Sequence, residues 1–212
     1  AAGGALFSHI IPGFTKLYPQ ITFSILERET NVLKEELLKK NLDAAYIDLY
    51  HFDDTDDKEN FEVFELFKTE NILVVSVDNP LVQRTDISYE ELQDEKLILY
   101  NGGKEVSSQV ELEMKKIGVS PNIAFVSTQW NFILDAVANN MGVVLCPYYI
   151  YSKYKNPRLA YVRMKSDQAY RQIGIVTKKN EYRTRACICF LDYATELSHY
   201  DGITERLLVP EK

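Results

Sequence analysis

Hydrophobic residues near the start of the chain recur every three or four positions, which is the spacing of one face of an α-helix. This apolar stripe consists of Leu6, Phe7, Ile10, Ile11, Phe14 and Leu17. Pro19 disfavours helical backbone at the residue before it, so we predict that the helix ends at Leu17 or Tyr18. Residues 21–25 then alternate between apolar and polar side chains, a pattern that predicts a β-strand.

A second helix is predicted to follow this strand, with the Asn31 side chain as its amino-terminal cap. Its residues Leu33, Leu37 and Leu38 share one face and are expected to be buried. Residues 44–47 form a short apolar run that predicts the next strand. Because neighbouring parallel strands need a crossover between them, the opening of the chain predicts a strand–helix–strand unit.

The rest of the chain alternates between strand-like and helix-like patterns. Apolar runs predict strands at 61–66, 72–75, 97–100, 123–126, 143–145, 159–164 and 171–177, and the polar residues 68–71 are expected to separate the first two. Helical spacing predicts helices over 106–117, 127–138 and 185–197. Ser88 and Glu91 have the spacing of a capping box, which predicts a short helix after Ser88. Such alternation is typical of a doubly wound α/β architecture.

Composition limits the classes of protein to which the chain can belong. The 212 residues are 46% hydrophobic and 26% charged, which favours a folded protein with a well-solvated surface. The 24 basic residues are outnumbered by 31 acidic ones, and the net charge of −7 disfavours direct binding of this chain to nucleic acid.

Cysteine content and hydropathy bear on localisation. Three cysteines are an odd number in a chain of this size and predict reduced thiols rather than a disulfide or metal framework. No apolar run reaches the roughly 18 residues that a membrane-spanning helix needs. The first residues have no basic region followed by an apolar core, so we expect no secretory signal. These features favour a cytoplasmic protein that makes no contact with a membrane.

The order of these signals resembles the effector-binding domain of LysR-type transcriptional regulators over roughly residues 5–197. The opening helix ends in Leu17-Tyr18-Pro19, and the second helix is followed by Asn41-Leu42-Asp43-Ala44-Ala45. Asn79-Pro80-Leu81 stands where the family usually has a His-Pro-Leu turn, and residues 87–92 match its strand and short helix. Residues 137–147 are similar to the signature V-A-x-G-x-G-I-x-x-x-P, with Asn140 in place of a glycine, which a left-handed asparagine can replace.

The resemblance implies the α/β fold of type 2 periplasmic binding proteins, in which two Rossmann-like lobes are joined by two crossover strands. The crossings are expected near 72–77 and 173–177. Lobe I would comprise residues 1–74 plus 175–212, and lobe II residues 75–174. The family's first strand precedes the residues that align with Gly3-Gly4, and Leu207-Leu208-Val209 is a candidate to occupy its position.

Candidate binding residues lie where strands give way to helices, because ligands of doubly wound sheets bind beyond the carboxyl ends of the strands. Helix amino termini there offer N–H groups without intrahelical partners and a partial positive charge that suits anions. The sequence predicts four such junctions, formed by Gly3, Gly4 and Ala5; Thr30 and Asn31; Asn101, Gly102 and Gly103; and Ser127, Thr128 and Gln129. Capping of their own helices is the alternative role of the polar residues among them.

Two aromatic groups extend this predicted site. Trp130 follows the last junction and is expected either over the mouth of the cleft or in the core. Pro147 and Tyr148 open a tyrosine-rich segment that could form a wall of the site or a surface for dimer contact. Arg28 and Lys104 are the nearest candidate counter-charges for an anionic ligand.

Catalytic and metal-binding motifs are missing from the sequence. His9, His51 and His199 are scattered, and neither H-E-x-x-H nor G-x-S-x-G occurs. Prephenate dehydratases share the two-lobed fold, but their Thr-Arg-Phe hallmark is replaced here by Thr184-Arg185-Ala186. Residues 53–59 superficially resemble a calcium loop but lack its required glycine, so we interpret them as a solvated acidic loop. We therefore predict no enzyme activity, catalytic residue, metal or cofactor.

The predicted function is to sense a small polar or anionic metabolite in the cleft between the lobes. In LysR-type regulators such an effector controls DNA binding and transcription through a winged helix–turn–helix that is absent from this chain. The resemblance implies a homodimer paired head to tail, a tetramer at full length, and promoter DNA as the partner of the missing domain. The wide apolar stripe of the first helix also predicts self-association. A solute-binding receptor of a transporter is the alternative, because it has the same fold.

Overall fold

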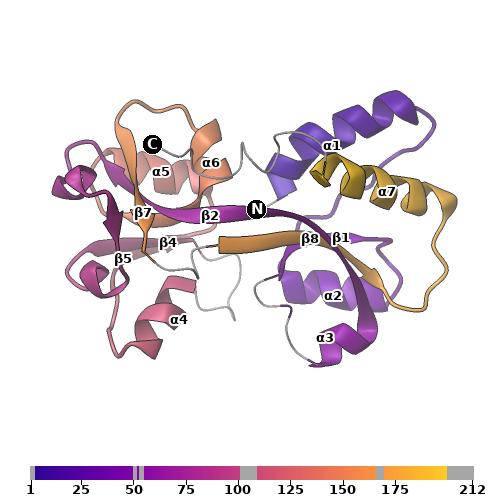
Figure 1. Ribbon diagram of the computed structural model, residues 1–212, viewed down its shortest axis with the longest axis horizontal. Helices are drawn as coiled ribbons and strands as arrows, with labels where there is room; N and C mark the ends of the chain where they lie inside the picture. Colours follow the sequence, from indigo (N-terminus) through magenta and orange to yellow (C-terminus); the bar gives the residue numbers. More distant parts are fainter. Residues whose placement is uncertain (1–2, 50–51, 53–54, 101–108, 166–169, 200–212) are drawn as a thin grey trace. The chain divides into compact units, whose positions relative to one another are not determined.

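The computed structural model describes residues 3–49, 52, 55–100, 109–165 and 170–199 (Figure 1). The described chain divides into two compact units. Unit 1 contains the residues up to Thr69 and those from Arg171 onward, and unit 2 contains Glu70–Tyr170. The divisions that we expected, at 74/75 and 174/175, lie four or five residues later in the chain. The chain passes from one unit to the other within strand β2 (Phe61–Ser76) and at the start of strand β8 (Tyr170–Lys178).

Unit 1 has a small sheet between two layers of helices. Strand β8 lies between β1 (Ala45–Asp48) and the first half of β2, and it runs antiparallel to β1. One face of the sheet carries α1 (Gly3–Leu17) and α7 (Arg185–His199), and the other carries α2 (Thr30–Leu38) and α3 (Thr55–Asn60) (Figure 1). The α2 side is filled by the cluster of Leu33, Leu37, Ala45, Ile47, Phe52, Phe61 and Val176.

The strand predicted at 21–25 is wrong, because residues 21–29 form no regular secondary structure. Aromatic packing holds this segment instead, with the Phe23 ring 5.7 Å from that of Phe14 and 5.3 Å from that of Phe190. A strand needs a neighbour for its backbone hydrogen bonds, and no described strand pairs with this segment. Alternation of side chains was therefore insufficient evidence for a strand, and Ile25 remains 56% exposed.

The second helix differs from the prediction in its cap and its buried face. It begins at Thr30, its cap position is Glu29 without a side-chain cap bond, and Asn31 lies inside the first turn. Leu33 and Leu37 are buried as expected, whereas Leu38 is 40% exposed.

We expected the acidic segment 53–59 to form a solvated loop, but its described residues, 55–59, lie in helix α3. Asp57 is only 7% exposed and makes an ion pair with Lys34 of α2. The same ammonium group lies 4.9 Å from the centre of the Phe52 ring. The prediction failed here because a cation distant in sequence neutralises one of the carboxylates.

Unit 2 is built on a mixed sheet. The second half of β2 pairs antiparallel with β6 (Val144–Pro147) on one side and with β7 (Leu159–Met164) on the other, and β7 pairs parallel with β3 (Asp86–Ile87). The parallel pair β4 (Lys96–Tyr100) and β5 (Asn122–Ser127) joins β6 through a parallel bridge between Leu97 and Val143. The helical segments of unit 2 are Pro80–Gln83, Glu90–Leu92, α4 (Gln109–Lys116), α5 (Trp130–Ala138) and α6 (Tyr148–Lys153).

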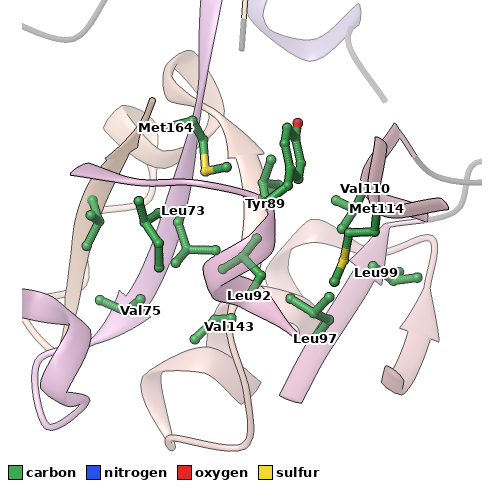
Figure 2. Packing of buried hydrophobic residues seen from close by; sticks show 13 residues of the cluster. Leu73, Val75, Tyr89, Leu92, Leu97, Leu99, Val110, Met114, Val143 and Met164 are labelled. Carbon is green, nitrogen blue, oxygen red and sulfur yellow. The ribbon is translucent and has the colours of Figure 1, made fainter. Parts of the chain in front are cut away.

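The core of unit 2 lies between the sheet and α4 (Figure 2). Alternate residues of β4 enter it, so Leu97 and Leu99 face this core while Ile98 points to the opposite face, where α5 packs. Val110 and Met114 of α4 cover them, as Figure 2 shows. The prediction that these two residues form a helix face is confirmed by their exposures of 5% and 0%.

Strand β2 continues through the polar residues that we expected to interrupt it. Thr69, Glu70 and Asn71 are 0%, 6% and 4% exposed. Asn71 lies opposite Pro147, and the ladder with β6 continues from there to Val74. The predicted separation of two strands at 68–71 is therefore wrong: Lys68 is exposed, but the other three polar side chains are buried within a continuous strand.

Local backbone geometry confirms two details of the family signature. Asn140 has φ of 55°, the left-handed conformation expected of it. A Cβ atom on Gly142 would lie 2.5 Å from the Lys96 carbonyl oxygen, so only glycine allows β4 to pass this close. The expected capping box is half formed: the Ser88 N–H donates to the Glu91 carboxylate at 2.9 Å. That hydrogen bond, with Lys165 and Arg84, lowers the pKa of Glu91 to about 2.

Two valines on β2 test where the stability of the fold lies. Val74 is 0% exposed and Val63 is 36% exposed. We expect Val74→Ala to lower the free energy of unfolding by about 2–3 kcal/mol, since it removes buried methyl groups and leaves a cavity. Val63→Ala is the matched control and should cost less than about 1 kcal/mol. Urea denaturation followed by circular dichroism measures both, and equal losses would contradict the assignment of the core.

Candidate functional site

The carboxyl ends of three strands meet at one edge of the unit 2 sheet. Tyr100 at the end of β4 pairs with Ser127 at the end of β5 in a parallel register. Strand β6 runs in the same direction beside β4 and ends at Pro147. Parallel strands bring the segments that follow them to the same edge, which is where doubly wound sheets bind ligands.

The segment after β5 belongs to the predicted site and forms a tight turn into α5. Its Gln129 N–H donates to the Ser127 hydroxyl oxygen at 3.1 Å. Gln129 occupies the cap position of α5 but makes no side-chain cap bond, and Thr128 is exposed. The alternative that Thr128 caps the helix therefore has no support, and its side chain is accessible to a ligand.

Trp130 is the first residue of α5 and stacks on Tyr100. The ring centroids are 4.5 Å apart and the planes differ by 3°. Both side chains are partly exposed. Tyr100 is not among the residues that the sequence predicted for the site. Its position as the last apolar residue of a strand, on the same face as Ile98, is the signal that could have identified it.

Pro147 and Tyr148 lie at the end of β6 and the start of α6. The Tyr148 ring lies 5.8 Å from that of Tyr161 on β7, which in turn lies 5.3 Å from that of Tyr151. Burial raises the pKa of both Tyr148 and Tyr151, so these hydroxyls stay protonated at neutral pH. Of the residues proposed from sequence, Thr128, Gln129, Trp130, Pro147 and Tyr148 all belong to the carboxyl edge of the unit 2 sheet.

The other predicted residues belong to unit 1 or lie outside the described residues. Gly3, Gly4 and Ala5 form the first turn of α1, while Thr30 and Asn31 begin α2. Asn101, Gly102, Gly103 and Lys104 lie outside the described residues. Arg28 donates to the neighbouring Glu27 carbonyl oxygen at 2.8 Å and is exposed.

Unit 1 also contains a cavity of about 120 Å³ that we did not predict. Its three basic residues are paired: Lys40 lies 2.9 Å and Lys178 3.7 Å from Glu181. Arg183 bonds Glu62 and donates to the Thr177 hydroxyl at 2.8 Å. The basic groups on its wall are therefore already paired with carboxylates, and an incoming anion would have to compete with these.

The three cysteines are free thiols. Cys146 is 0% exposed, and burial raises its pKa. Cys187, on the wall of the unit 1 cavity, is 9% exposed, and burial followed by the nearby Asp43 carboxylate raises its pKa. Within the described part of the chain, no group of three or more His, Cys, Asp or Glu side chains could hold a metal ion. No described helix is long and apolar enough to span a membrane.

Comparison with known proteins places this architecture in a family. Residues 1–198 match the model of the LysR substrate binding domain. The uncharacterized HTH-type transcriptional regulator YwbI of Bacillus subtilis is 24% identical over 191 residues, which are 90% of this chain and 62% of YwbI. The regulator OxyR of Escherichia coli is 24% identical over 175 residues, 82% of this chain and 56% of OxyR.

Two solved structures have the same fold. The BenM effector binding domain with its effector benzoate has a TM-score of 0.76 and 19% identity, and the alignment covers 92% of this chain and 86% of BenM's. The effector binding domain of QuiR in complex with shikimate has a TM-score of 0.73 and 19% identity over 91% of this chain and 90% of QuiR's.

The chain belongs to the family of LysR substrate binding domains. It therefore has the type 2 periplasmic-binding-protein-like α/β fold that its sequence predicted. Its relatives are transcriptional regulators rather than enzymes. They give no support to the alternative hypothesis of a solute-binding receptor of a transporter. The chain spans about 60% of the length of these curated relatives.

Thiol reactivity tests the burial of the cysteines. A thiolate is the reactive species, so a raised pKa slows reaction at neutral pH. Cys189 lies on α7 and is partly exposed. We expect 5,5′-dithiobis(2-nitrobenzoate) at pH 7.5 to modify Cys189 quickly in the native protein, and all three thiols only after denaturation. Cys189→Ser should abolish the fast phase and Cys146→Ser should leave it. A fast phase that survives Cys189→Ser would contradict the burial of the other two thiols.

Proposed function

We propose that this domain senses a small polar or anionic metabolite and so controls DNA binding by a full-length transcription regulator in the cytoplasm. The family match over residues 1–198 carries the proposal. The effector contacts the strand-to-helix junctions of the domain, among them Thr128 and Gln129. Promoter DNA is bound by a winged helix–turn–helix outside this chain, which is consistent with the net charge of −7.

The chemistry of the unit 2 edge supports a small anionic effector. Helix α5 begins there, and the first N–H groups of a helix have no intrahelical partner. The exposed Thr128 hydroxyl adds a donor and acceptor beside them. The effectors named for the BenM and QuiR domains, benzoate and shikimate, are small ring carboxylates. A carboxylate is therefore the first class of compound to test.

Peroxide sensing is a second candidate, because OxyR-type relatives are described as hydrogen peroxide-inducible genes activators. Such sensing by a thiol requires a low pKa and access to solvent. Cys146 and Cys187 have the opposite properties, because both are buried and have raised pKa values. Burial and the raised pKa values therefore argue against peroxide sensing by Cys146 or Cys187 and favour reversible binding of a metabolite.

A metabolite screen by thermal shift tests the proposed function. A ligand at a hundredfold its dissociation constant stabilises the native state by about 2.7 kcal/mol, which raises Tm measurably. For the compound that binds, Thr128→Val should raise Kd about tenfold, the loss expected for one hydrogen bond to a charged group. Thr22→Val, at an exposed threonine of the segment 21–29, is the control and should leave Kd unchanged. Failure of every polar or anionic metabolite to raise Tm would reject the proposal.

The domain forms a dimer through the α1 side of unit 1, and the full-length protein is a tetramer. Apolar residues remain uncovered on α1, on α7 and on the segment between α1 and α2: Leu17 is 64%, Ile25 56% and Ile188 45% exposed. Apolar residues grouped on a surface mark interfaces. Ile10 and Phe14 of the predicted stripe are buried in unit 1, and Ile11 is partly exposed. Among the stripe residues whose exposure is described, Leu17 is the one fully available to a partner.

One charged substitution tests this interface. Leu17→Glu should convert the dimer to a monomer in light scattering, because a two-fold interface contains every contact twice. Val32→Glu is the matched control: Val32 is 38% exposed on α2, on the other face of the unit 1 sheet (Figure 1), and its substitution should leave the mass unchanged. An unaltered protein that is monomeric at high micromolar concentration would refute the dimer.

A further inference from the structure

Two aromatic rings at the carboxyl edge of the β4–β5 pair lie face to face. Tyr100 and Trp130 have centroids 4.5 Å apart and planes within 3° of parallel. Stacked carbon atoms come no closer than about 3.5 Å, so the two rings are displaced sideways by roughly 2–3 Å. An offset stack is a favourable arrangement of two π systems. The pair is therefore a stable flat surface.

The core of unit 2 fixes this surface in place. Trp130, Ile133, Leu134 and Val137 share one face of α5, because their spacing is i, i+3, i+4 and i+7. The last three are 0% exposed, whereas Trp130 at the start of the helix remains partly exposed. Tyr100 is the last residue of β4 and is partly exposed, whereas Ile98, the preceding residue on the same face of the strand, is 0% exposed. Both rings are thus ordered before any ligand arrives.

We propose that the Tyr100–Trp130 pair is the specificity-determining wall of the effector site and selects flat, unsaturated ring acids over saturated ones. This inference rests on the proposed function, because it assigns the effector class of the same site. A planar ring stacks along its whole face on an aromatic wall, whereas a puckered saturated ring touches it only with protruding hydrogens. Since the wall is already rigid, binding does not have to order it. The larger contact area of a planar ring should therefore lower its Kd relative to that of a saturated ring.

A second aromatic pair on neighbouring elements has a different geometry and supplies the control. Phe125 of β5 and Phe132 of α5 have centroids 5.5 Å apart, but their planes are tilted by 54°. The tilted rings present no common flat face. Phe132 is 57% exposed, so its truncation leaves the core intact.

The test compares benzoate with cyclohexanecarboxylate, which have the same charge and ring size but differ in planarity. Trp130 is the only tryptophan, so its fluorescence reports binding at this wall directly. We expect benzoate to perturb the emission and to bind with a Kd about 2- to 12-fold lower than that of cyclohexanecarboxylate. Calorimetry should give the same ratio for Phe132→Leu and a ratio near one for Trp130→Leu. If Trp130→Leu fails to fold, Tyr100→Leu replaces it in the test. This substitution removes the ring on which Trp130 stacks, and it should also give a ratio near one.

Two results would refute the proposed role of the Tyr100–Trp130 pair and leave the proposed function intact. One is equal Kd values for the two acids in the unaltered protein; the other is a preference for benzoate that survives both Trp130→Leu and Tyr100→Leu. If neither acid binds but a saturated polar metabolite raises Tm, the wall is again rejected and the sensing function stands. If no small molecule of any class raises Tm, the proposed function itself fails.

Discussion

Strand β2 carries the constraint on which the rest of the structure depends. Each backbone N–H and C=O of a buried strand needs a partner, and β2 finds them in different neighbours along its length. Its first half lies in the sheet with β8 and β1, and its second half pairs with β6 and β7. The buried polar residues 69–71 mark the point where one set of neighbours replaces the other. Both units are therefore built on a single continuous strand.

The candidate site is a consequence of strand direction in unit 2. Because β4, β5 and β6 run parallel, the turns that follow them come together at one edge. The core on the α4 side orients Leu97 and Leu99, so the alternate residues Ile98 and Tyr100 face α5. The register of a strand thus determines which aromatic residue meets Trp130. Packing far from the edge positions the side chains that a ligand would meet.

Local patterns predicted most of the helices and strands because apolar spacing reflects the face that an element buries. The strand at 159–164 and the left-handed Asn140 are examples of this agreement. Two of the failures share a cause, because each depended on a neighbour distant in sequence. Residues 21–25 have no described partner strand, and Asp57 is neutralised by Lys34. In the candidate site, Thr128 and Trp130 could be predicted from their place at a junction. Tyr100 was missed, although it shares a strand face with Ile98, because its stacking on Trp130 across two elements leaves no periodic signal of its own.

The division of the chain between the units has a consequence for the order of folding during synthesis. Unit 2 is one uninterrupted stretch, Glu70–Tyr170, and it is complete before the last part of unit 1 has been made. Unit 1 lacks β8 until then, although β8 lies between β1 and β2 in its sheet. Residues 1–69 are therefore synthesised before β8, the strand that lies between β1 and β2. While unit 2 folds, the unpaired edges of β1 and β2 can pair with the wrong strands. The central strand of unit 1 is therefore made only after the whole of unit 2.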